Sequence, residues 1–164
     1  MILGKVKVSH IGNFLDRVAK ASNDIHSMGR SYCGPYNSNL SLETIQIIVP
    51  MPWLAAMQQE IQELLIAHGF VGYNDLRESV LCIGGKGNSG IPFRMNNYLD
   101  IGVRVHVSLQ TGGKFEGRRV IEYEKGDVIL FTIEDSNQQC THACNERSTH
   151  LVFVFFHESQ PVIS

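Results

Sequence analysis

The spacing of apolar side chains divides the chain into a helical first part and a strand-rich second part. Apolar positions recur with a helical period over 10–21 and 53–68, which predicts two amphipathic helices. The segment 22–42 is rich in Asn, Ser, Gly and Pro and is predicted to be a long loop. Alternating or β-branched segments predict strands at 2–9, 45–49, 79–83, 102–110, 119–124, 127–133 and 149–156.

The strands of the second part follow one another without a helical segment between them. This order favours an antiparallel sandwich or barrel over a parallel sheet. The Gly-rich segment 84–90 lacks the spacing of a phosphate-binding loop and is predicted to be a flexible connection between strands. Neither part alone would bury much surface, so we expect one α+β domain over 1–164. In this domain a helical and loop-rich region, 1–75, supports a β-structure formed by 76–164.

Composition and charge exclude several classes of protein. Of the 164 residues, 43% are hydrophobic, which is enough for one core and too much for a disordered chain. The 14 Lys and Arg nearly balance the 16 Asp and Glu, which argues against a broad grip on nucleic acid or on an anionic membrane. The longest apolar run, Leu151–Phe156, is far shorter than the ~20 residues of a membrane helix. With no signal-peptide pattern and four dispersed cysteines, we expect a reduced, cytoplasmic protein.

Histidines are the first candidates for chemistry, because four of the seven lie in the last 60 residues. In the predicted strand 102–110, Arg104, His106 and Ser108 alternate with apolar residues and therefore share one face. Such a polar face most often points to solvent. The alternative is a polar pocket.

A second cluster follows the predicted strand 127–133. If this part of the chain is extended, Cys140, His142 and Cys144 point to the same side. Imidazole is a good ligand for Fe, Zn, Ni or Cu, and thiolate is a good ligand for Zn. Two histidines that converge from separate strands inside a barrel can hold a metal with open positions for substrate, whereas a lone loop histidine is an ordinary polar residue.

The order of short motifs over 98–157 carries a family resemblance. An Arg-x-His strand is followed by a Glu-x-Gly strand ending in Phe, an Asp-Ser turn, a second His near an Asn, and a basic residue before an apolar strand. The residues are Arg104, His106, Glu124–Phe131, Asp135, Ser136, His142, Asn145 and His150. This order resembles the aspartyl/asparaginyl β-hydroxylase branch of the iron(II)/2-oxoglutarate-dependent oxygenases. The resemblance implies a double-stranded β-helix, a jelly-roll or cupin-like barrel, with supporting N-terminal helices.

The resemblance also implies cofactors and an activity. His106 and His142 would bind Fe(II) and would be the catalytic candidates. Ser108 takes the place of the acidic ligand of most such oxygenases, a carboxylate that this branch lacks. The candidates for binding 2-oxoglutarate are Arg104, Ser108, Arg147 and His150, of which His150 stands where the family has Arg. The chain would hydroxylate a peptide side chain or a small amino-acid-like substrate, with 84–97 as a candidate lid.

Two other interpretations stay open. One is a zinc-binding, cupin-like protein that uses His106, Cys140, His142 and Cys144. The other is a non-catalytic binding module, because the acidic ligand is absent at Ser108 and the family arginine is replaced at His150. In each case the expected partner is a small molecule or a peptide, not nucleic acid or a membrane.

Overall fold

The computed structural model describes 1–20, 30–33, 44–83, 87–90, 102–109, 112–116, 120–132, 141–144 and 149–159. Its strands form two antiparallel sheets. The larger sheet has seven strands in the order β1 (Ile2–Lys5), β9 (Asp127–Phe131), β6 (Gly102–Ser108), β11 (Thr149–Phe156), β4 (Asp75–Ile83), β3 (Thr44–Ile48) and β2 (Arg30–Cys33). The smaller sheet has four, in the order β5 (Gly87–Gly90), β10 (Thr141–Cys144), β7 (Gly113–Glu116) and β8 (Val120–Tyr123).

From β4 onward the chain passes back and forth between the two sheets. β4, β6, β9 and β11 belong to the larger sheet, and β5, β7, β8 and β10 belong to the smaller one. This winding defines a double-stranded β-helix, so the predicted α+β class and barrel fold are confirmed. The first part of the chain contributes β1, β2 and β3 to the larger sheet in addition to its helices.

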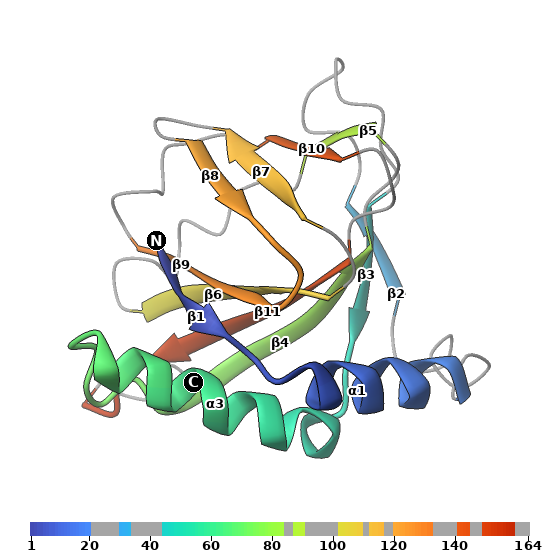
Figure 1. The fold of residues 1–164 in the computed structure, drawn as a ribbon. Coiled ribbons are helices and arrows are strands. Elements are labelled where there is room, and N and C mark those ends of the chain that lie inside the picture. The colour runs from blue at the N-terminus through green and yellow to red at the C-terminus, as the bar shows by residue number, and fades with distance from the viewer. Residues whose placement is uncertain are drawn as a thin grey trace.

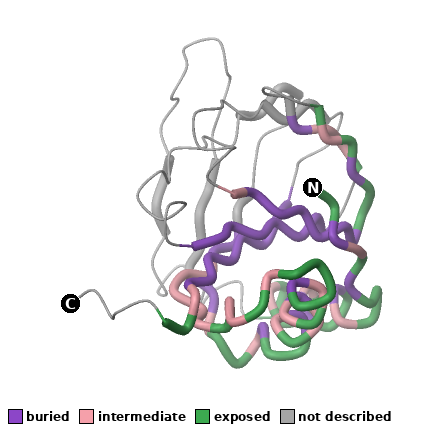
Figure 2. Tube along the Cα trace, turned by 90° about the vertical axis from the view of Figure 1, so that its left-hand side faces the viewer, coloured by how far each residue is buried: buried purple, intermediate pink, exposed green. Residues whose placement is uncertain are grey.

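Three layers are visible in Figure 1: the smaller sheet, the larger sheet, and the helices on the outer side of the larger sheet. The helices are α1 (Val8–Lys20), a short 3-10 helix η1 (Met51–Leu54) and α3 (Ala55–Ala67). Figure 2 shows buried chain through the central strands, and every residue of β6, β9 and β11 is buried. These strands are covered on both faces, which explains the nearly continuous apolar sequences of β9 and β11.

The main core lies between the larger sheet and the helices. The sheet contributes the residues of β6 and β11 that alternate outward, and the helices contribute one apolar face each. This core includes Val103, Val105, Val107, Leu151, Phe153, Phe155, Ile11, Phe14, Met57, Ile61 and Leu65. Glu60 of α3 adds a polar link, because its carboxylate accepts the backbone N–H of Lys7 at 3.1 Å and contacts Nδ1 of His10 at 2.8 Å. The carboxylate thereby lies at the positive N-terminal end of α1.

Both predicted helices are confirmed, with small changes at their ends. The first begins at Val8, so the predicted strand 2–9 ends at Lys5. Two predicted connections are wrong: β2 lies within the expected loop 22–42, and β5 lies within the expected flexible segment 84–90. β5 pairs with β10 along the backbone, and this pairing needs no apolar alternation in the sequence. Within the described part of the chain, no helix is long and apolar enough to cross a membrane.

Two glycines give opposite expectations for stability. Gly126, in the turn between β8 and β9, has φ +86° and donates its N–H to the carbonyl of Ser108 at 2.8 Å. Gly126→Ala is expected to lower the free energy of unfolding by about 1–2 kcal/mol, because L residues are strained at positive φ. Gly12 of α1 has open space around it, so Gly12→Ala is expected to raise this free energy by about 0.5–1 kcal/mol. Urea denaturation of the two variants measures these changes in the free energy of unfolding. Changes of the same sign and size would contradict the backbone conformations of Gly126 and Gly12.

Candidate functional site

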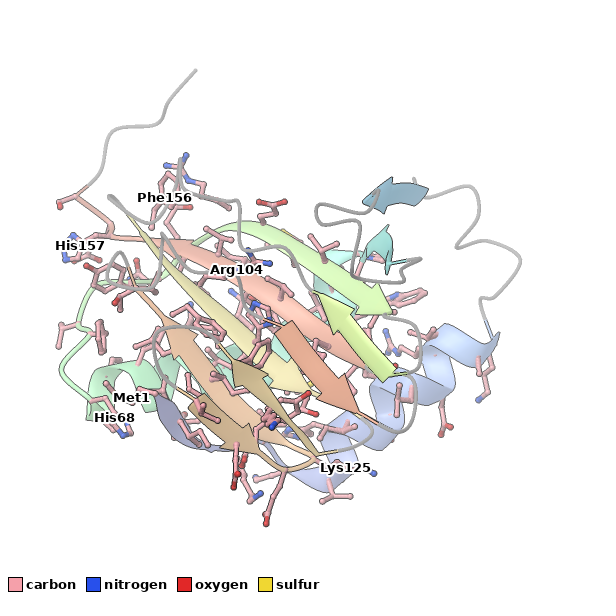
Figure 3. The ribbon with its side chains drawn as sticks, turned by 90° about the horizontal axis from the view of Figure 1, so that it is seen from above. Met1, His68, Arg104, Lys125, Phe156 and His157 are labelled. Atoms are coloured by element: carbon pink, nitrogen blue, oxygen red, sulfur yellow. The ribbon has the colours of Figure 1, made fainter. Side chains whose placement is uncertain are left out.

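The inner face of the larger sheet carries polar residues at its centre. Arg104, His106 and Ser108 of β6 alternate with the valines that face the helices, and they are 2%, 0% and 1% exposed. The interpretation of this pattern as a solvent-exposed face is therefore wrong. The smaller sheet lies over these residues and converts a polar strand face into a polar interior. Figure 3 shows Arg104 within the outline of the strands, whereas His68 and Lys125 lie at its rim.

His106 lies between the two sheets and is surrounded by rings. The centroid of its imidazole is 5.0 Å from the Phe131 ring on β9 and 5.5 Å from the Phe115 ring on β7. The His150 ring on β11 is 5.9 Å away. Since β7 belongs to the smaller sheet and the other strands to the larger one, His106 is at the point where the sheets meet.

His150 begins the inner row of β11 and is held from the smaller sheet. It pairs directly with Ser108 in the register of β6 and β11 and is 1% exposed. The hydroxyl of Tyr123 on β8 is 3.2 Å from its Nε2. Sequence reasoning missed Tyr123. The alternation of 120–123 was the available signal, because it places every second residue of this strand on the inner face.

Glu78 is a second residue that the sequence did not point to. In the larger sheet Val154 pairs with Glu78 on one side and with Arg104 on the other, so the two charged residues share a row of the inner face. Burial raises the pKa of Glu78 above its ordinary value of 4.5, and the positive charge of Arg104 opposes part of this rise. This face of the sheet therefore carries a buried cation and a half-buried acid that interact electrostatically.

This coupling gives a pH-dependent prediction. Because the pKa of Glu78 is raised in the folded state, protonated Glu78 stabilises the folded protein at low pH, and this contribution is lost as the pH rises through the folded-state pKa. Glu78→Gln is expected to raise the free energy of unfolding at neutral pH and to change it little below pH 4.5. The gain should be larger in an Arg104→Met background. Denaturation at neutral pH and below pH 4.5 measures the free energy of unfolding of each variant. A gain in this free energy that occurs only at low pH would contradict the raised pKa of Glu78.

The remaining predicted site residues lie partly outside the described structure. His142 belongs to β10, where its backbone is directly opposite Phe115 of β7 and Ser89 of β5. The side chains of His142 and Cys144 lie outside the described residues, as do Cys140 and Arg147. Of the candidate lid, only the backbone of β5 is described. The structure thus brings together Arg104, His106, Ser108 and His150, and it adds Tyr123 and Glu78.

The described interior side chains fit a carboxylate more completely than they fit a metal ion. A buried guanidinium, an imidazole and hydroxyl groups are the donors that bind carboxylates in proteins. For a metal, His106 supplies a suitable imidazole. Among the side chains that the structure describes, however, no three of the His, Cys, Asp or Glu type lie close enough to share one ion.

Comparison with known proteins supports the fold through structure alone. No protein-family model matches the sequence, and no curated protein matches it significantly. AviO1 from Streptomyces viridochromogenes Tue57 superposes with a TM-score of 0.63 at 12% identity, over 99% of this chain and 91% of AviO1. A prolyl hydroxylase from Trichoplax adhaerens, in complex with a peptide fragment, gives 0.60 at 12% identity, over 92% and 79%.

A third solved structure adds a bound cosubstrate. The viral collagen prolyl hydroxylase of Paramecium Bursaria Chlorella virus-1, in its 2-oxoglutarate complex, gives a TM-score of 0.55 at 10% identity, over 93% of this chain and 91% of that one. These identities establish a shared fold and nothing finer. The chain is a double-stranded β-helix protein that is structurally similar to AviO1 and to prolyl hydroxylases. These three structures do not show the aspartyl/asparaginyl β-hydroxylase branch.

Proposed function

We propose that this chain is an iron(II)- and 2-oxoglutarate-dependent hydroxylase. The observation that carries the proposal is Arg104, a guanidinium that is only 2% exposed inside a double-stranded β-helix. Burial of a cation is costly unless an anion or other acceptors compensate it. The same row contributes Glu78, a half-buried carboxyl group whose pKa is raised by burial. A dicarboxylate ligand would add an anion that a guanidinium can bind with two parallel hydrogen bonds.

Within this proposal each interior residue has a separate task. Arg104 and His150 bind the carboxylates of 2-oxoglutarate, Ser108 donates a hydroxyl hydrogen bond to them, and Arg147 is a further cation for this purpose. His106 and His142 hold Fe(II) from the two sheets. His142 is opposite Phe115, whose ring is in contact with His106, and this proximity supports the pairing. Bound iron would supply the oxidising chemistry that inserts oxygen into a C–H bond.

The substrate would be a peptide side chain or a small amino-acid-like molecule. One structurally similar protein, a prolyl hydroxylase in complex with a peptide fragment, supports this substrate class. The segment 84–97 would close over the substrate at the mouth of the barrel.

A non-catalytic binding module is the second candidate, and two residues favour it. Ser108 provides no carboxylate for a metal, and His150 is a less reliable carboxylate ligand than Arg. Such a module would bind a carboxylate through Arg104 without needing iron. A zinc-binding form would instead use Cys140, Cys144 and the two histidines.

Metal binding separates these candidates. Metal-free protein is titrated anaerobically with Fe(II) and, separately, with Zn(II), using the wild type, His106→Ala and His142→Ala. One Fe(II) per chain is expected, with affinity at least about tenfold weaker in each variant. His68→Ala is the matched control, because His68 is exposed at the end of α3. Binding of Fe(II) that ignores both substitutions would refute the proposed ligands. Tight binding of Zn(II) that is lost in a Cys140→Ala/Cys144→Ala double variant would favour the zinc form.

A further inference from the structure

Tyr123 connects the two sheets at the base of the interior. It is 4% exposed, and its hydroxyl is 3.2 Å from Nε2 of His150. Its ring centroid is 5.2 Å from that of Phe115 and 5.3 Å from that of His150. Three contacts from two neighbours therefore restrict both the ring and the hydroxyl of Tyr123.

The same residue lines a groove between residues of the larger and the smaller sheet. This groove has a volume of about 600 Å³ and is formed by residues of β1, β7, β8 and β9, with Tyr123 in its wall. Gly113 is directly opposite Tyr123 in the register of β7 and β8 and also lines the groove. Because glycine has no side chain, nothing from this position of β7 covers the ring. Tyr123 consequently separates the groove from the buried imidazoles.

The contact between Tyr123 and His150 has a chemical consequence. A neutral imidazole carries its proton on one nitrogen, and the hydrogen bond made by the other nitrogen selects which one. A hydroxyl fixed beside Nε2 therefore holds the orientation of the His150 ring, and it donates to Nε2 or accepts from it according to the tautomer of the imidazole. Arg presents several N–H donors in a fixed planar arrangement that matches a carboxylate, and an imidazole does not. A histidine that binds a carboxylate in place of an arginine therefore depends more on a neighbouring group that fixes its ring.

We propose that Tyr123 is a positioning residue of the interior site: its hydroxyl holds His150 in the orientation that binds a carboxylate. This inference rests on the proposed function, since His150 is assigned there to 2-oxoglutarate. It adds a residue of the smaller sheet to the carboxylate-binding candidates Arg104, Ser108 and His150, which belong to the larger sheet.

The variant that isolates the hydroxyl is Tyr123→Phe, which keeps the ring in the wall. The affinity for 2-oxoglutarate in the presence of Fe(II), measured by anaerobic calorimetry, is expected to fall about three- to tenfold, the effect of one lost hydrogen bond. The ¹⁵N chemical shifts of the His150 imidazole, assigned by comparison with His150→Gln, are expected to change already in the ligand-free protein. A purely structural tyrosine would leave these shifts in place. Tyr73→Phe is the control, because Tyr73 packs against Phe70 and His157 elsewhere.

The affinity for 2-oxoglutarate and the ¹⁵N shifts of His150 test different claims. If wild-type protein does not bind 2-oxoglutarate, the proposed function is wrong, and the ¹⁵N shifts of the ligand-free protein still decide whether Tyr123 fixes His150. Unchanged shifts and unchanged affinity in Tyr123→Phe would overturn the positioning role. If Tyr123→Phe does not fold, the wild-type spectrum is decisive: a hydrogen-bonded Nε2 supports the role, and an imidazole that exchanges between tautomers overturns it.

Discussion

Arg104→Met is expected to weaken the binding of 2-oxoglutarate about a hundredfold or more, while the protein stays folded. Hydrogen bonds to charged groups contribute about 1.5–3 kcal/mol each, and a guanidinium can make two to one carboxylate. Methionine fills a similar space, and replacement of a buried charge by an apolar side chain is often neutral for stability. Glu78 would lose the charge that lowers its pKa and would become protonated more readily.

Anaerobic calorimetry measures the affinity for 2-oxoglutarate, and two further variants serve for comparison. Arg104→Lys keeps the charge but loses the bidentate geometry, so we expect an intermediate affinity. Arg77→Met is the matched control, because Arg77 lies on β4, hydrogen-bonds to Asp75 at 2.6 Å and stacks over the ring of Phe156. The assignment of Arg104 would be wrong if Arg104→Met bound 2-oxoglutarate as tightly as Arg77→Met does.

Phe153→Ala is expected to lower the free energy of unfolding by about 3–5 kcal/mol. Phe153 is completely buried on the helix-facing side of β11, and its ring stacks with that of Phe155 at a centroid distance of 6.0 Å. Truncation to alanine leaves a cavity in the core between the larger sheet and the helices, where packed strands and helices can relax only partly.

The comparison for Phe153→Ala is Val120→Ala on β8. Val120 is 60% exposed, so its truncation should change the free energy of unfolding by no more than about 0.5 kcal/mol. Urea denaturation of both variants measures the difference. Similar effects of the two substitutions would contradict the position of the main core on the helix side of the larger sheet.

The sequence predicted the elements whose side chains pack on apolar partners. The helical spacing of 53–68 and the apolar run of 149–156 both correspond to observed elements, because burial of a face imposes a period on the residues. β5, with the sequence Gly-Asn-Ser-Gly, could not be predicted in this way. It is paired through its backbone with β10, a strand distant in the sequence, and the residues of β5 carry no periodic signal.

The candidate site was predictable only in part, for a related reason. Alternation along β6 shows that Arg104, His106 and Ser108 share a face, but it cannot distinguish solvent from an opposing sheet. That distinction depends on Phe115 and Tyr123, which belong to the smaller sheet. The hydrogen bond between Tyr123 and His150 joins residues 27 positions apart, and no local pattern encodes such a contact.

Equilibrium binding of 2-oxoglutarate to metal-free protein, with and without Fe(II) and under anaerobic conditions, tests the central claim most directly. We expect binding that Fe(II) strengthens, and we expect His106→Ala to abolish this strengthening while binding through Arg104 persists in weaker form. That result would establish the interior of the barrel as a joint site for iron and 2-oxoglutarate. Absence of 2-oxoglutarate binding in the wild type, both with and without Fe(II), would contradict the account.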